Sequence, residues 1–318
     1  MRQTPAELGA TPLGIFDFLA RAAASGKRGV LVTMTDREGS SLRALGSHMA
    51  VLADGRYAGS FSAACIEAAI VSEARETLAA GCDRIVRFGK GSPYIDIRLP
   101  CGGGIDLLFQ PSPAQEIARA AERLRGRSPI ELALAPNRPM RIEHGWSNRA
   151  AGWQGGEFLV RHAPPLRLVI AGEGGEPLAL ARLAEAYGAE IELLSPDGKT
   201  AATASNEGYP FQRLRGLAAP PALALDAWTA LALLFHEHEW ETALLAEALE
   251  TEAFWIGAMG SERAHEARLQ ALADRGVPAE RRARVHGPIG LIPAARDPAT
   301  LALSALAEIA GDYQRLIR

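Results

Sequence analysis

The sequence predicts an α/β protein in which a small amino-terminal α/β domain is followed by a Rossmann-like domain with a doubly wound parallel sheet. Three observations predict this class. Strand-like runs alternate with helix-period segments after residue 166, an Asp-Gly hairpin lies near the amino terminus, and a stretch of weak periodicity separates the two regions. We therefore expect an amino-terminal domain over residues 1–113, a connecting segment over 114–165 and the Rossmann-like domain over 166–318.

Composition sets limits on the class of function. The chain has 318 residues, of which 48% are hydrophobic and 22% are charged, so it can bury the cores of two domains. Its formal net charge of -3 provides no broad positive field, which argues against nucleic acid or an anionic membrane as a partner. The sequence contains no recognisable secretory signal and no uncharged apolar run of bilayer length, so we expect a cytoplasmic protein.

The three cysteines are isolated from one another in the sequence. Cys65, Cys82 and Cys101 form no CxxC pair and have no closely spaced histidine. This pattern indicates free thiols in a reducing compartment, and neither a disulfide framework nor a zinc site.

The amino-terminal region is expected to begin with a helix, a strand and a hairpin. Apolar residues recur at helical spacing over residues 11–26, and a β-branched run over 29–35 predicts a strand. Strands at 48–53 and 56–61 are joined by Asp54 and Gly55, a pair typical of a type I′ turn in which both residues have positive φ. A helix over 63–80, capped by Ser62 and ended by Gly81, and strands at 84–88 and 105–109 complete this domain.

The rest of the chain divides into a weakly patterned and a regular part. Residues 114–124 predict a helix, and the remainder up to 165 predicts only short strands among Pro, Asn and Gly. A strand at 166–171, a helix at 178–187 and a strand at 190–195 then form a βαβ unit, which implies a parallel sheet. Further strands at 230–235 and 254–259 are each followed by a helix, and Asp297 and Pro298 begin the last helix.

A glycine-rich turn follows the first strand of the expected parallel sheet. Gly172 and Gly174 match the first two glycines of a dinucleotide fingerprint, whereas Pro177 stands where the third glycine or alanine belongs. Two glutamates in this turn place negative charge beside the anion site, and Ser195 ends the second strand where an acid usually binds the ribose. We therefore favour a Rossmann-like turn that no longer binds NAD over a working NAD site.

A second strand-to-helix turn contains Gly260 and Ser261. Ser261 is expected to cap the next helix, and the amides behind it can hold a phosphate, with Arg263 and Arg268 supplying charge. A plain capped helix is the alternative. His286 precedes a Gly-Pro turn, and a lone histidine is more often a structural hydrogen-bonding group than a ligand.

Polar and thiol side chains in the amino-terminal region are candidates for binding an oxyanion. Ser40, Ser41 and Arg43 lie on a loop between strands and offer hydroxyls and a guanidinium. Cys65 lies in the first turn of an expected helix, where the dipole favours the thiolate, although the nearby Glu67 opposes it.

Cys101 has an unusual setting because three glycines follow it. A thiol beside Gly102 and Gly103 has almost no side chains to pack against, so core packing explains it poorly. We therefore expect Cys101 to have a functional role, more so than Cys65.

These motifs, in this order, resemble the XdhC/CoxI family, the accessory proteins of xanthine dehydrogenase and related molybdenum hydroxylases. The resemblance covers both domains, and the chain departs from the family pattern at Ala63-Ala64 and Glu176-Pro177. The matching segments read GSSLRALG (39–46), SFSAACIEAAI (60–70), LPCGGGID (99–106), IAGEGGEP (170–177), FWIGAMGS (254–261) and RVHGPIGL (284–291).

The resemblance implies a chaperone that binds molybdenum cofactor and protects it while a cysteine desulfurase installs a terminal sulfur. The chaperone then delivers the cofactor to an apo-hydroxylase of the xanthine dehydrogenase type, without catalytic residues of its own, and we expect a homodimer. The residues expected to bind the cofactor, with Cys101 also as metal ligand, are Ser40, Ser41, Arg43, Cys65, Glu67, Cys101, Gly102, Gly103, Gly172, Gly174, Gly175, Gly260, Ser261, Arg263 and His286.

Two other classes of function compete with this interpretation. The parallel sheet and the first glycine turn favour an NAD(P)-dependent oxidoreductase, but the sequence has no Tyr-xxx-Lys pair and no clear acid after the second strand. A docking protein that joins desulfurase and hydroxylase without binding cofactor is the third possibility, and it would need a large exposed apolar patch.

Overall fold

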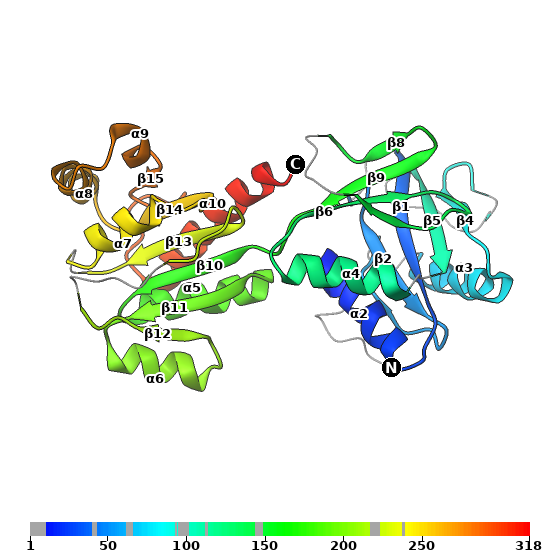
Figure 1. Cartoon of the computed structure of the whole chain (residues 1–318), viewed down its shortest axis with the longest axis horizontal. Helices are drawn as coiled ribbons and strands as arrows, with labels where there is room; N and C mark the ends of the chain where they lie inside the picture. Colours follow the sequence, from blue (N-terminus) through cyan, green and yellow to red (C-terminus); the bar gives the residue numbers. More distant parts are fainter. Residues whose placement is uncertain are drawn as a thin grey trace. The chain divides into compact units, whose positions relative to one another are not determined.

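The computed structural model describes residues 11–39, 43–61, 66–92, 94, 102–111, 114–143, 149–216, 223–236 and 239–318. The chain divides into two compact units, Met1–Pro164 and Pro165–Arg318 (Figure 1). In the part of the chain that is described, no helix has the length and apolar character needed to span a bilayer.

The first unit contains a five-stranded antiparallel sheet. Its strand order is β3-β2-β1-β5-β4, and alternate residues of the central strand face opposite sides of the sheet. Val30 and Val32 pack in one hydrophobic core with helix α3, whereas Leu31 packs in another core. The elements are β1 (Gly29–Glu38), β2 (His48–Leu52), β3 (Tyr57–Ala58), α3 (Glu67–Ala80), β4 (Arg84–Gly89) and β5 (Gly104–Pro111).

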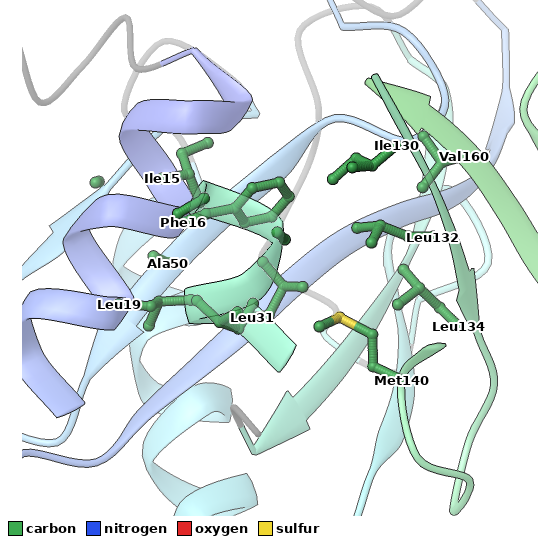
Figure 2. Packing of buried hydrophobic residues seen from close by; sticks show 14 of the residues in the cluster. Ile15, Phe16, Leu19, Leu31, Ala50, Ile130, Leu132, Leu134, Met140 and Val160 are labelled. Carbon is green, nitrogen blue, oxygen red and sulfur yellow. The ribbon is translucent and has the colours of Figure 1, made fainter. Parts of the chain in front are cut away.

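The segment assigned to a connection in the sequence analysis holds regular structure in this unit. The expected helix at 114–124 is confirmed as α4, and the weakly patterned remainder forms a four-stranded sheet of order β7-β6-β9-β8. Figure 2 shows Phe16 and Leu19 of α2 near Leu31 of β1, with Leu132 and Leu134 of β6 in the same core. The elements are α2 (Pro12–Ala24), α4 (Ala114–Arg125), β6 (Ile130–Leu134), β7 (Arg141–Glu143), β8 (Gly152–Gln154) and β9 (Glu157–His162).

The predicted hairpin is confirmed, but its turn type differs from the prediction. The amide of Gly55 donates to the carbonyl of Leu52 at 2.9 Å, and Gly55 has φ +87° while Asp54 does not have positive φ. This is the pattern of a type I turn followed by one left-handed residue, because the loop is one residue longer than a type I′ turn allows. Gly81 ends α3 in the left-handed conformation as predicted. The helix begins at Glu67 with Ile66 at the N-cap position, so the predicted start at residue 63 with Ser62 as cap and Cys65 in the first turn is wrong; Ser62 and Cys65 themselves lie outside the described residues.

The second unit is built on a six-stranded parallel sheet of order β12-β11-β10-β13-β14-β15. This is the Rossmann order 3-2-1-4-5-6, in which the chain reverses direction across the sheet between β10 and β13. The doubly wound parallel sheet predicted from the sequence is therefore confirmed. The strands are β10 (Arg167–Gly172), β11 (Glu190–Ser195), β12 (Phe211–Arg213), β13 (Thr229–Leu234), β14 (Trp255–Ala258) and β15 (Val285–His286).

Helices cover both faces of the parallel sheet (Figure 1). Helices α7 and α8 share a hydrophobic core with one face, and α5 packs against the strands β10 and β11 and against α10. The capping predictions for α8 and α10 are confirmed, since Ser261 Oγ accepts from Ala264 N at 3.2 Å and Asp297 Oδ1 accepts from Thr300 N at 2.9 Å. The helices are α5 (Gly175–Tyr187), α6 (Gly198–Asn206), α7 (Glu241–Ala248), α8 (Glu262–Asp274), α9 (Ala279–Arg282) and α10 (Pro298–Leu316).

Candidate functional site

A cavity of about 970 Å³ opens at the carboxyl end of the parallel sheet in the second unit. Its walls are Glu176 of α5, residues 235–236 after β13, residues 259–262 and Ala264 after β14, and residues 288–297 after β15, with Leu301 of α10. Open α/β sheets bind ligands outside the carboxyl ends of their strands, near the position where the strand order reverses. This cavity is therefore the candidate binding site of the second unit.

The turn after β14 forms one wall of the cavity. Gly260 has φ +142°, and a Cβ there would lie 3.2 Å from the Ala264 side chain, so a larger residue would press on the first turn of α8. Gly260 and Ser261 both line the cavity at the amino-terminal end of this helix. The two residues singled out in the sequence thus lie where helix amides face a ligand.

The two arginines proposed to supply charge at this turn occupy different positions. Arg263 is exposed on α8 and is not among the residues that line the cavity. Arg268 is buried and pairs with Glu241, with Nε to Oε2 at 3.0 Å and Nη2 to Oε1 at 3.1 Å. The expectation that Arg268 contacts an anion is therefore wrong, because its charge is compensated inside the fold.

His286 lies on β15 and is held by a carboxylate. Its Nδ1 lies 3.0 Å from Glu308 Oε1, and its ring lies 5.1 Å from the ring of Trp255. Glu308 Oε2 also accepts from the amide of Gly290, a cavity-lining residue, at 2.5 Å. Burial raises the pKa of Glu308, but these hydrogen bonds outweigh it and leave that pKa below its usual value. His286 thus connects to the cavity wall through Glu308.

Other atoms of the protein lie close to all three glycines of the first Rossmann turn. A Cβ at Gly172 would lie 2.3 Å from the carbonyl oxygen of Leu234, so the ends of β10 and β13 approach too closely for any side chain. Glu176 Oε2 lies 3.3 Å from the Cβ position of Gly174, and Pro298 Cγ lies 3.6 Å from that of Gly175. A carboxylate therefore occupies the neighbourhood in which a dinucleotide fingerprint receives its pyrophosphate.

The glycines that follow Cys101 lie at one end of the antiparallel sheet in the first unit. Gly104 pairs with Glu38 across β5 and β1, and a Cβ at Gly39 would lie 3.5 Å from the Cα of Gly103. The segment beginning at Gly102, which has φ +67°, therefore runs beside Gly39, the residue that follows β1 and begins the 39–46 motif. The structure brings these two sequence motifs together.

An ion-pair network supports this glycine segment. Arg87 Nη2 donates to Glu38 Oε2 at 2.8 Å, Nη1 to Asp106 Oδ1 at 3.1 Å and Nε to the carbonyl of Lys90 at 2.8 Å. A hydrogen bond and the charge of Lys90, followed by Arg87, lower the pKa of Glu38. A Cβ at Gly104 would lie 2.7 Å from the Lys90 carbonyl, which explains why this position is glycine.

Arg43 and Glu67 also meet in the first unit, through Ser60. Arg43 Nε donates to the Ser60 carbonyl at 3.0 Å, and Ser60 Oγ donates to Glu67 Oε1 at 2.7 Å. Glu67 is 3% exposed and begins α3, where the helix dipole favours a carboxylate. The Ser60–Ile70 motif therefore contacts the loop motif that ends at Arg43.

Four of the predicted binding residues, Ser40, Ser41, Cys65 and Cys101, lie outside the described residues. Among the residues that are described, no cluster of three or more His, Cys, Asp or Glu side chains has an arrangement suited to a metal ion. Cys82, which is described, is an exposed free thiol.

Sequence reasoning missed most of the cavity wall. His236 and Arg296 line the cavity together with three carboxylates, Glu176, Glu262 and Asp297. The sequence indicated Glu176 only as charge beside the first glycine turn and Asp297 only as a helix cap. For the other three residues the only sequence signal is position, since each follows a strand of the parallel sheet or begins the helix after it. The cavity therefore has mixed charge and is not a simple anion site.

Comparison with known proteins gives consistent matches over both units. Residues 22–89 match the XdhC and CoxI family, and residues 168–309 match the XdhC Rossmann domain. The molybdenum cofactor insertion chaperone PaoD of Escherichia coli (strain K12) is 38% identical over 297 residues, which are 93% of this chain and 87% of that protein. The uncharacterized protein YqeB of the same organism is 30% identical over 48% of this chain and only 28% of its own length.

A solved structure shares the fold of the whole chain. The crystal structure described as a xanthine dehydrogenase from Bacillus halodurans superimposes with a TM-score of 0.77 over 96% of each chain. Its sequence is 18% identical, so this likeness concerns the fold alone.

Proposed function

The chain belongs to the XdhC and CoxI family, and from this premise we propose that it is an accessory protein that binds molybdenum cofactor. The observation that carries the proposal is the 38% identity, over nearly the whole length of both chains, to a molybdenum cofactor insertion chaperone. The chaperone protects the cofactor during sulfuration by a cysteine desulfurase and delivers it to a hydroxylase of the xanthine dehydrogenase type. It acts in the cytoplasm as a homodimer and carries out no turnover of its own.

The cavity in the second unit supports this proposal by its size and chemistry. Its volume of about 970 Å³ lies at the upper end of the range for small-molecule sites. The amino-terminal end of α8 at Ser261 offers amides to the cofactor's phosphate, and the carboxylates of Glu176 and Glu262 offer acceptors to the N–H groups of a pterin.

The glycine segment of the first unit supports a role for the Cys101 thiol. A metal–sulfur centre prefers a soft thiolate ligand, and a chain without side chains at Gly102 and Gly103 allows a bulky ligand to approach. We assign to this unit a thiolate site at Cys101, with Ser40, Ser41, Arg43, Cys65 and Glu67 as further binding residues.

The first test compares protein purified from a host that makes molybdenum cofactor with protein from a cofactor-deficient host. Molybdenum is measured by mass spectrometry and oxidised pterin by fluorescence, and both samples are titrated with NADH. We expect pterin in the first sample alone and no NADH binding. NADH binding without pterin would instead support an oxidoreductase, and the absence of both would support a docking protein, so either result contradicts the proposal.

A pair of thiol variants tests the assignment of Cys101. Cys101→Ser is expected to lower the molybdenum bound per chain by about tenfold, because a hydroxyl is a poor ligand for a soft metal. Cys82→Ser removes an exposed thiol of the same unit and serves as the matched control. Equal molybdenum content in the two variants would show that Cys101 does not bind the metal.

A pair of leucine variants tests the cavity. Leu291 is 65% exposed and lines the cavity, whereas Leu303 on α10 is 55% exposed and does not line it. A glutamate at position 291 adds a further negative charge where a phosphorylated ligand binds, so Leu291→Glu is expected to reduce pterin content and Leu303→Glu to leave it unchanged. Equal pterin content in both variants would place the ligand elsewhere.

A further inference from the structure

A buried ion pair lies behind the cavity wall of the second unit. Arg268 of α8 and Glu241 of α7 each have side chains that are 1% exposed, and they form two parallel hydrogen bonds of 3.0 and 3.1 Å. Helices α7 and α8 pack against each other and share an apolar core that includes Leu244 and Leu272. A fully charged pair therefore lies beside an apolar core.

Stability alone does not account for this pair. Removing two charges from water is costly, and well-packed hydrophobic residues of similar volume often stabilise a fold as much as a buried ion pair does. Arg268 Nη1 is buried as well and has no hydrogen-bond partner among the residues that the structure describes. An arrangement that leaves a buried donor unused is expected to serve another purpose.

A third hydrogen bond connects the pair to the cavity. Arg268 Nη2 donates to the carbonyl of Met259 at 2.9 Å, while the amide of Met259 donates to the carbonyl of Leu233 on β13 at 2.9 Å. The Cβ position of Gly260 lies 3.6 Å from the same Nη2. Met259 is thus fixed on both sides, and the guanidinium lies directly behind the turn.

We infer that the Glu241–Arg268 pair is a positioning device that holds the Met259–Ser261 turn in the conformation that receives the cargo. Arg268 does not line the cavity, so it acts through the turn and not by contact with ligand. A planar guanidinium can bind Glu241 in a bidentate manner and still donate to Met259, which no apolar side chain can do. This inference rests on the proposed function, since it assigns residues that shape the proposed site.

Three variants separate positioning from stability. Arg268→Met removes one charge of the buried ion pair and is expected to lower Tm by roughly 10 °C. The double variant Glu241→Leu/Arg268→Met removes both charges and is expected to restore Tm to near the wild-type value. Arg268→Lys keeps a charged donor that can reach Met259 or Glu241 without the bidentate geometry.

Each variant is purified from the cofactor-making host and measured in three ways. Tm reports stability, hydrogen exchange of the amides at 259–262 reports the turn, and pterin content after dialysis reports retention. The control is Arg182→Met/Glu207→Leu, which removes an exposed Arg–Glu pair of the same unit that does not line the cavity. We expect the control to match the wild type in turn exchange and retention.

The decisive result is the order of the variants. If the pair positions the turn, the double variant has near-native Tm but faster exchange at 259–262 and about tenfold lower retention. Arg268→Lys then retains more pterin than the double variant although its Tm is lower. If retention follows Tm across the set, or if the double variant binds as the wild type does, the inference is overturned. Absence of pterin from the wild type itself would refute the proposed function instead.

Discussion

Lowering the pH from 7.5 to 5.0 is expected to destabilise the first unit through two buried histidines. His48 on β2 and His162 on β9 face each other with their Nε2 atoms 2.9 Å apart, and Thr33 Oγ1 lies 2.9 Å from His48 Nδ1. Phe16 packs against both rings, at 5.4 and 5.6 Å between centroids. One proton between the two Nε2 atoms satisfies both rings, whereas two protons would set two donors against each other.

The direction and size of the effect follow from the pKa values of the two states. Burial, and next the charge of His162, lower the pKa of His48 well below its usual value, and burial lowers the pKa of His162 to about 3. Histidines in the unfolded chain have a pKa of about 6.5. Below that pH the unfolded state therefore binds more protons than the folded state, and the free energy of unfolding falls. Between pH 7.5 and 5.0 the loss is about 2 kcal/mol for each histidine, or about 4 kcal/mol for the pair.

Urea unfolding at pH 7.5, 6.5, 5.5 and 5.0 measures this loss. Hydrogen exchange of the β2 and β9 amides reports the first unit separately from the second. The double variant His48→Gln/His162→Gln is expected to remove most of the pH dependence, because glutamine does not titrate. His236→Gln, at an exposed position of the second unit, is the control. If the double variant keeps the wild-type pH dependence, the histidines are not the cause and the reasoning is refuted.

Two further predictions concern glycine and arginine positions. Gly172→Ala places a Cβ 2.3 Å from the carbonyl oxygen of Leu234 and is expected to lower the free energy of unfolding by about 2 kcal/mol or more. The control Gly198→Ala meets no atom within 4 Å and is expected to be neutral or slightly stabilising. Urea unfolding measures both variants, and equal free energies of unfolding would contradict the steric argument. Arg87→Met removes the network that supports the glycine segment, so hydrogen exchange at residues 102–106 is expected to become faster, and unchanged exchange would show that the backbone pairing of β5 is sufficient.

Local sequence signals predicted most of the fold because they act over a few residues. The caps Ser261 and Asp297 satisfy amides three residues away, and Gly81 and Gly188 end helices in a conformation that glycine adopts at low cost. The parallel sheet followed from the alternation of strand and helix. The four-stranded sheet of residues 130–162 was not predicted as a sheet, since its strands are short and its stability comes from packing against α2 and α4.

The candidate site was predictable only in part. Gly260 and Ser261 predicted the start of a helix, and the structure places both residues in the cavity wall. The sequence also indicated charge at Arg268, but an arginine gives no local sign of whether it faces a ligand or a buried carboxylate. Glu241 lies 27 residues away from it in the chain and becomes its partner only when α7 packs against α8.

By itself the sequence determined most of the helices and strands, the caps at Ser261 and Asp297, the doubly wound parallel class of the second unit and the resemblance to the family. The tertiary structure alone decided which distant side chains lie together: Arg268 behind Met259, and His48 against His162 across 114 residues. The physical reason is how far apart along the chain the interacting residues lie. Backbone propensity and capping depend on neighbours in the chain, whereas burial, ion pairing and cavity shape depend on residues that only packing brings together.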